Sequence, residues 1–214
     1  MRLNLFPFII LLIPLLTLLI IMFAMTRIII LCKQRANYHH PTSLADLHHD
    51  SPQLILNPVY QGGKISNLST SVSTSVIDLR GDNVTLKIIE SDKTKTLASP
   101  GITDSVKSAL DSALSRNGAN ISNLATTRFE LDIHQLQAVV TEKMMTHTSD
   151  AKIELGLRVI RNSSTFSKVY RGNANLEGPL SHDRAKIEGQ LNKLTEQIIT
   201  RIVSDPELIA YLEG

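Results

Sequence analysis

The pattern of hydrophobic and polar positions divides the chain into three parts. Residues 5–25 contain no charged side chain and are almost all Leu, Ile, Phe or Met, and a helix of about 20 such residues spans a bilayer core. Residues 33–52 are polar, contain two prolines and show no period, as is typical of a tether. We therefore expect a signal or transmembrane anchor over residues 1–32, a linker over 33–52, and a folded domain over 53–214.

Short alternating runs predict the first strands of this domain. Residues 53–59, 72–79 and 84–90 have apolar side chains at roughly every second position, which is the period of a half-buried strand. The Arg-Gly-Asp-Asn stretch at 80–83 is a strong turn sequence, so the two strands beside it are at hairpin distance.

Longer alternation predicts three further strands that form an antiparallel meander. Apolar residues alternate over 129–133, and after a one-residue shift near His134 the alternation resumes over 136–140. Such a shift predicts a β-bulge at His134. Residues 151–159 alternate without interruption, and residues 166–176 form a third, weaker strand.

Two amphipathic helices complete the predicted fold. Apolar residues recur in steps of three and four over 102–117 and 183–203, with Gly118 ending the first helix and Ser181 capping the second. A short helix follows at 207–212. The fold class is therefore α+β: a two-layer sandwich of an antiparallel β-sheet with two helices packed on one face, plus the N-terminal hydrophobic membrane helix.

Composition and charge exclude several functions. The positive net charge of +2 comes from four basic residues among residues 1–37, which leaves 18 basic and 20 acidic residues in the remainder. Such a near-neutral domain lacks the charge needed to bind nucleic acid. A single cysteine excludes a disulfide framework, and the absence of Trp argues against a stacking surface for bases or sugars.

Two interpretations of the N-terminal segment stay open. In the first it is a secretory signal, with Arg2 as its positive end, and Cys32 becomes the lipid-carrying first residue of a lipoprotein. Ile29 fits the residue pattern before such a cysteine, whereas Leu31 is too large and Arg27 places a charge near the cut. In the second interpretation the segment stays uncleaved as a membrane anchor.

The chain contains no recognisable catalytic motif, and we predict no catalytic residue, metal site or cofactor. Histidine pairs at 39–40 and 48–49, the second followed by Asp50, lie in the linker. Adjacent side chains of an extended chain point in opposite directions, so these pairs are poor chelators. His134 at the expected bulge is interpreted as a half-buried strand residue bonded to the backbone, because no partner acid or metal ligand is identifiable.

The arrangement resembles the YajG family of bacterial lipoproteins over Leu54–Leu212. The stretches that carry the resemblance are FELDIHQLQAVV, DAKIELGLRVI, YRGNANLEGP and the closing helix that ends DPELIAYL. The resemblance implies an outer-membrane lipoprotein that faces the periplasm and has no assigned reaction. It also implies that Cys32, the only position that can match the lipid-carrying cysteine, is the attachment site.

These observations favour a non-enzymatic binding or structural module, anchored to a membrane lipid bilayer with its domain in the periplasm, that contacts another envelope protein through its surface or a sheet edge. The membrane is the outer one if Cys32 is lipidated and the inner one if the helix is retained. The alternative is a small-ligand or lipid-binding component of an envelope transport system, which requires a large apolar pocket between the layers. A third hypothesis, a hydrolase, requires a cleft in which His134 meets an acid and a nucleophile.

Overall fold

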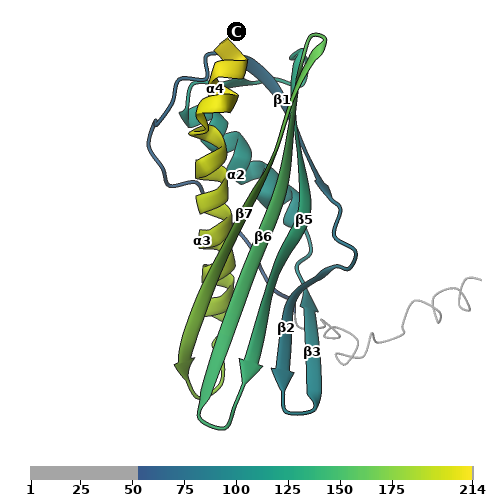
Figure 1. Cartoon of the computed structure of the whole chain (residues 1–214), viewed down its shortest axis with the longest axis vertical. Coiled ribbons are helices and arrows are strands. Elements are labelled where there is room, and N and C mark those ends of the chain that lie inside the picture. Colours follow the sequence, from purple (N-terminus) through teal and green to yellow (C-terminus); the bar gives the residue numbers. More distant parts are fainter. Residues whose placement is uncertain (1–52, 214) are drawn as a thin grey trace, which may run out of the picture. The chain divides into compact units, whose positions relative to one another are not determined.

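A curled sheet of seven strands carries helices on one of its faces (Figure 1). The computed structural model describes residues 53–213. In chain order the elements are β1 (Ser71–Asp78), β2 (Val84–Glu90), β3 (Lys93–Ala98), α2 (Ile102–Arg116), β4 (Asn120–Ile121), β5 (Thr127–Glu142), β6 (Thr146–Arg161), β7 (Ser164–Pro179), α3 (Arg184–Val203) and α4 (Pro206–Glu213). The predicted α+β class, with two amphipathic helices on one face, is confirmed.

Strands β5, β6 and β7 form the predicted antiparallel meander, and each is 16 residues long. They extend beyond their predicted bounds because hydrophilic residues continue the alternation: in β6, His147 and Ser149 are buried, whereas Thr146 and Thr148 are exposed. The predicted bulge is confirmed, since the register of β5 against β6 shifts between Ile133 and Gln135. Both His134 and Gln135 are consequently exposed.

The prediction of a purely antiparallel sheet is wrong, because β1 and β2 do not form a hairpin. Both run parallel to β5, β1 beside residues 127–133 and β2 beside residues 138–142. Strand β6 occupies the opposite edge of β5, so β1 and β2 lie end to end along one edge. The loop at 79–83 therefore passes the bulge without reversing the direction of the chain. Its sequence alone did not show whether the chain turns back as a hairpin or continues along β5. β3, which the hydrophobic pattern did not predict, pairs with β2.

Residues 53–61, here called the strap, form no strand, which corrects the strand predicted at 53–59. They are extended, and their alternate side chains are buried, including Leu54 and Tyr60. One backbone bond joins the strap to a strand, from the N–H of Leu54 to the carbonyl of Ala98 at the end of β3. Further along, the strap bonds to helix α3: the N–H of Ile55 donates to Glu188 Oε1 at 2.9 Å. Two further strap N–H groups donate to the side chains of Asn192 and Glu196, one and two turns further along the helix. The strap therefore alternates like a strand, but side chains of α3 take the place of most of a partner strand.

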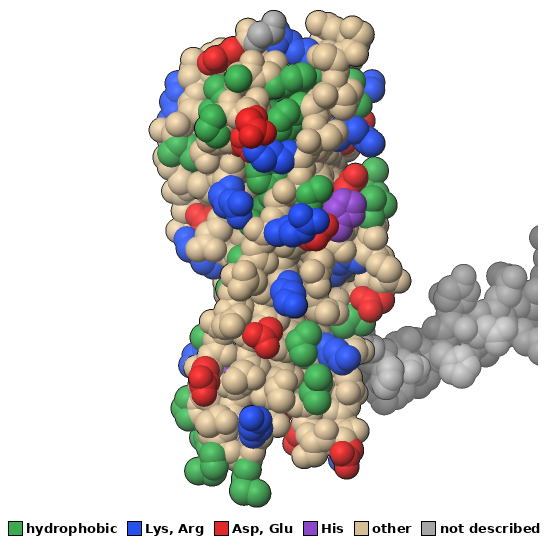
Figure 2. Space-filling model, viewed as in Figure 1, with side chains coloured by type: hydrophobic (Ala, Val, Ile, Leu, Met, Phe, Trp, Pro, Cys, Tyr) green, Lys and Arg blue, Asp and Glu red, His purple; other side chains and the backbone are tan. Residues whose placement is uncertain are grey.

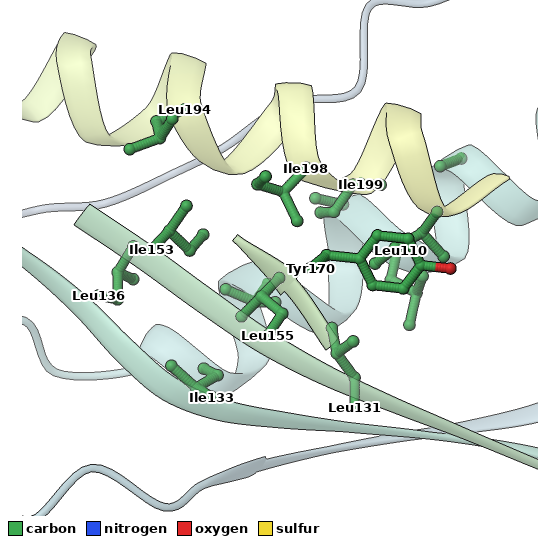
Figure 3. Close-up of a cluster of buried hydrophobic side chains, with 14 of the residues drawn as sticks. Leu110, Leu131, Ile133, Leu136, Ile153, Leu155, Tyr170, Leu194, Ile198 and Ile199 are labelled. Atoms are coloured by element: carbon green, nitrogen blue, oxygen red, sulfur yellow. The ribbon is translucent and has the colours of Figure 1, made fainter. Parts of the chain in front are cut away.

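The core lies between the inner face of the sheet and the helices (Figure 3). Leu131 and Leu155 of the sheet and Ile198 of α3 point toward one another and are at most 1% exposed. Helix α3 is capped by Asp183, whose side chain accepts the N–H of Ala185 at 2.9 Å, instead of by the predicted Ser181. Gly118, at φ 96°, follows α2 as predicted.

None of the helices between residues 53 and 213 has the length and apolar character needed to cross a membrane. The predicted anchor segment at 1–32, the linker at 33–52 and the proposed attachment residue Cys32 lie outside the described residues.

Candidate functional site

The outer face of strands β5, β6 and β7 is open, and polar side chains from the three strands stand side by side on it. Strand pairing places Gln135 beside Glu154 and Arg171, Gln137 beside Lys152 and Asn173, and Val139 beside Asp150 and Asn175. We call the eight polar members of these three rows the polar grid. Its side chains point away from the helices because successive residues of a strand alternate between the faces.

Hollows of the molecular surface lie over the grid. One, of about 500 Å³, is lined by the second and third rows together with Gln135 and Ala151. A smaller one of about 280 Å³ lies over the first and second rows and shares Gln135, Lys152 and Asn173 with it. The grid is therefore a hollowed surface that a partner can contact.

Several grid side chains have unused hydrogen-bonding capacity. Within residues 53–213, the side chains of Gln135, Lys152 and Asn173 make no hydrogen bond to the protein. An amide offers both donors and an acceptor, and a lysine offers three donors. These three side chains lie on three adjacent strands and so present a mixed set of donors and acceptors to a polar partner.

Other members of the grid are fixed by their neighbours. Arg171 Nε and Nη2 donate to the two oxygens of Glu154 at 2.7 and 3.1 Å, and these bonds lower the pKa of the Glu154 carboxyl. In the orientation that satisfies its partners, the Asn175 amide donates to Asp150 Oδ1 at 3.2 Å. Fixed pairs therefore flank the three side chains with unused capacity. Over the visible part of the domain, charges of both signs are interspersed (Figure 2).

His134 differs from its prediction. It is exposed instead of half-buried, and among residues 53–213 it has no hydrogen bond to the backbone or to any side chain. Its ring instead lies over Gly156 on the neighbouring strand, where an added Cβ would be 2.6 Å from His134 Nε2. A glycine in the middle of β6 thus makes room for the ring at the bulge.

Arg80 is a structural residue of this site that the sequence analysis missed. Its side chain is only 6% exposed and pairs with Asp78 at 2.7 Å, and hydrogen bonds from Arg80 lower the pKa of Asp78 more than burial raises it. Arg80 Nη1 also donates to the carbonyl of Leu136 and to Thr85 Oγ1. These contacts of the arginine hold the 79–83 loop beside the bulge. In the sequence, the position of Arg80 between a strand end and a glycine indicated only a turn.

The hydrolase hypothesis is not supported by the residues around His134. A hollow of about 410 Å³ brings His134 together with Asp82, Glu154 and Arg80, but no Ser, Thr, Cys or Tyr lines it. The acid required by that hypothesis is present, and the nucleophile is not. In the part of the chain from residue 53 to 213, no cluster of three His, Cys, Asp or Glu side chains could hold a metal ion. The linker histidines lie outside that part.

The alternative of a ligand carrier required a large apolar pocket between the layers. Side chains from both layers fill that space: Leu110 of α2 and Ile133 of β5 are fully buried, and Leu194 of α3 is 3% exposed. Gly172 of β7 is so close to α3 that an added Cβ would lie 2.9 Å from Ile198 Cδ1. The four hollows described for residues 53–213 all lie on the surface.

The fold and the site thus define a two-layer α+β domain. Helices cover the inner face of its sheet, and the outer face is polar and free of helices. Residues 63–213 match the family model Lipoprotein_16, described as uncharacterized lipoprotein. Because this match covers more than half of the chain, the chain belongs to that lipoprotein family, and the predicted resemblance to YajG-type lipoproteins is confirmed. A search of curated proteins finds no match to the chain.

Solved structures show more distant likenesses. Protein XCC0632 from Xanthomonas campestris, of family-model DUF330, has a TM-score of 0.47 and 13% identity, covering 76% of this chain and 95% of that one. The PelC dodecamer from Paraburkholderia phytofirmans has a TM-score of 0.35 and 10% identity, covering 67% and 91%. Lipoprotein GNA1162 from Neisseria meningitidis has a TM-score of 0.33 and 8% identity, covering 64% and 99%. Likenesses at this level imply nothing about function.

Proposed function

We propose that the chain is a membrane-anchored lipoprotein of the cell envelope whose domain lies in the periplasm and acts as a non-enzymatic binding module for another envelope protein. Membership of a lipoprotein family supports the anchor. The open polar grid is the single observation that supports binding. One face of the sheet is free of helices there, and three of its side chains have unused hydrogen-bonding capacity.

A protein partner fits the grid better than a sugar or a small apolar ligand does. Amides and paired charges recognise polar groups through directed hydrogen bonds, and polar contacts of this kind are usual at the surfaces of transient complexes. The grid contains no aromatic side chain on which a sugar ring could stack. Its hollows are open to solvent and most of the residues that line them are polar, whereas small-ligand sites are mostly apolar and enclosed.

Photo-crosslinking in intact cells tests the binding face. A photoreactive amino acid is placed at Lys152 or Asn173 on the grid, and at Ser108, an exposed position on α2, as the matched control. We expect a discrete protein adduct from both grid positions and none from position 108. Adducts from all three positions, or from none, would contradict the proposal.

Intact-mass analysis of the membrane-extracted protein tests the anchor. A mass that begins at Cys32 and includes acyl chains supports the lipoprotein interpretation and an outer-membrane location. A full-length mass supports a retained helix. In that case Cys32→Ala would change the mass only by the difference between the two side chains and would leave the membrane association unchanged. Recovery of the intact chain in the soluble fraction would refute anchoring by either route.

A further inference from the structure

Three exposed apolar side chains gather at one end of the sheet, beyond the polar grid. Met144 and Met145, in the turn between β5 and β6, are 95% and 67% exposed, and Leu180, just after β7, is 62% exposed. We call these three residues the apolar tip. Figure 2 shows hydrophobic side chains protruding at the lower end of the domain, where the β5–β6 turn lies in Figure 1.

Hydrogen bonds join the two segments of the tip into one unit. The N–H of Leu180 donates to the carbonyl of Met145 at 2.9 Å. The carbonyl of Leu180 lies 3.1 Å from Nδ1 of His147, a side chain that is only 4% exposed. Nearby, Glu142 Oε1 accepts the N–H of His182 at 2.8 Å and contacts its ring Nδ1 at 2.7 Å. These hydrogen bonds hold the two segments of the tip in place relative to each other.

The backbone of Leu180 adopts a conformation that is unfavourable for a leucine. Its φ is 60°, in the left-handed region where glycine or asparagine is the usual residue. A bulky residue held there costs free energy and persists because surrounding contacts impose it. Here those contacts turn a leucine side chain out into solvent, where it contributes nothing to the core.

The described part of the chain begins nearer to the tip than to the opposite end of the domain. Strap residue Ile55 is bonded to Glu188, in the second turn of α3, a short distance after Leu180 along the chain. The residues before the strap include the 33–52 linker, whose extended reach is about 70 Å. Leu124, an exposed residue before the start of β5, lies at the far end of a 16-residue strand, about 50 Å from the tip.

We propose that the apolar tip inserts into the interface of the lipid bilayer to which the chain is anchored, an inference that rests on the membrane anchoring proposed above. The occupant is lipid because the three side chains protrude from two turns. Met144 and Leu180 border a surface hollow of about 490 Å³ whose other lining residues are polar, among them Lys143. Exposed apolar side chains rimmed by polar residues fit the headgroup–acyl boundary. Three side chains bind a membrane only weakly by themselves, and the tether makes that contact effective by raising the local concentration of the bilayer.

Tryptophan fluorescence tests this contact without background, since the chain contains no Trp. Met144→Trp is introduced into the full chain, which is reconstituted into vesicles of phosphatidylethanolamine and phosphatidylglycerol with and without brominated acyl chains. Leu124→Trp is the matched control, because Leu124 is 93% exposed at the opposite end. We expect the fluorescence of the Met144→Trp chain to shift to shorter wavelength and to be quenched by brominated lipid about twofold more than that of the control.

The possible outcomes separate this inference from the anchoring on which it rests. If the chain sediments with the vesicles but both tryptophans are quenched equally, anchoring stands and tip insertion is wrong. A shift to shorter wavelength without lipid quenching would mean that the tip contacts protein, which also overturns the inference. If the chain does not sediment with vesicles, both proposals fail. Adding Leu180→Gly to the Met144→Trp chain should reduce the lipid quenching while circular dichroism shows the fold retained.

Discussion

The two faces of the long meander are built from neighbouring residues of the same strands, yet they are constrained differently. Ile153 on the inner face is 1% exposed, whereas Lys152, the preceding residue, points to solvent and has no partner within the described part of the chain. Packing against the helices accounts for the inner side chains. On the outer face, no hydrogen bond within residues 53–213 accounts for Gln135, Lys152 and Asn173, although ion pairs and amide bonds hold their neighbours. A polar surface that folding does not require is the better place to look for function.

The largest expected effect is on the inner face. Ile153→Ala removes fully buried methyl groups next to Gly172 and α3. It should lower the free energy of unfolding by about 2–5 kcal/mol. Urea denaturation followed by circular dichroism measures it, with Lys152→Ala as the control on the opposite face. A loss of stability equal to that of the control would mean that the layers are not closely packed.

A smaller loss is expected where the inner face contains a buried polar contact. Tyr170 is 3% exposed and its hydroxyl donates to Asp205 Oδ2 at 2.7 Å, which links β7 to the start of α4. Hydrogen bonds to charged groups contribute about 1.5–3 kcal/mol, so Tyr170→Phe should cost about that much. The control is Tyr211→Phe, whose hydroxyl is near the surface, and which should cost less.

The pH dependence of this contact checks its origin. Burial raises the pKa of Asp205, but hydrogen bonds from Lys168 and Tyr170 outweigh burial and hold it below its ordinary value of 3.8. A lowered acid pKa contributes stability that is present above the ordinary pKa and is lost as pH falls through the lowered one. The stability difference between wild type and Tyr170→Phe should therefore shrink below about pH 4. A difference independent of pH would assign the loss to packing.

Periodicity predicted the parts of the fold that depend on burial alone. The α2 and α3 stripes, the meander and the bulge at His134 all follow from which side chains face the core. Pairing partners were not predictable in the same way. The segment at 84–90 alternates equally well whether it reverses after β1 or continues along β5, and the strap at 53–61 alternates although helix side chains bond it.

The candidate site was less predictable because its residues meet only through the register of three strands. Gln137, Lys152 and Asn173 are far apart in the sequence, and each is an ordinary outward-facing strand residue. The bulge did draw attention to His134, but not to Gly156 opposite it. Arg80 was assigned to a turn because burial of an arginine also depends on acceptors that are distant in the sequence, in this case the Leu136 carbonyl.

A small change in the free energy of unfolding is expected when Gly156 is replaced by alanine, and its sign depends on the His134 ring. Replacing a strand glycine by alanine normally gains about 0.5–1 kcal/mol, but here the new Cβ must displace the His134 ring. Gly156→Ala should therefore be about neutral in the wild type and should stabilise the His134→Ala variant by roughly 0.5–1 kcal/mol. A double-mutant cycle measures this coupling. Equal effects in both backgrounds would show that the ring does not lie over the glycine.

The smallest effect on stability is expected on the polar grid, where the effect on binding should be largest. Lys152→Glu reverses a charge at an exposed position, so the free energy of unfolding should change by less than about 0.5 kcal/mol. Lys95→Glu on β3 is the matched control, because Lys95 is also an exposed strand lysine with no partner between residues 53 and 213. With the photoreactive amino acid at position 173, Lys152→Glu should reduce the adduct about tenfold and Lys95→Glu should leave it unchanged. Equal adduct yields from the two variants would mean that the outer face is only solvated. If a partner bound there and the sheet stayed intact, reversing the charge at Lys152 in the middle row of the grid would change its affinity.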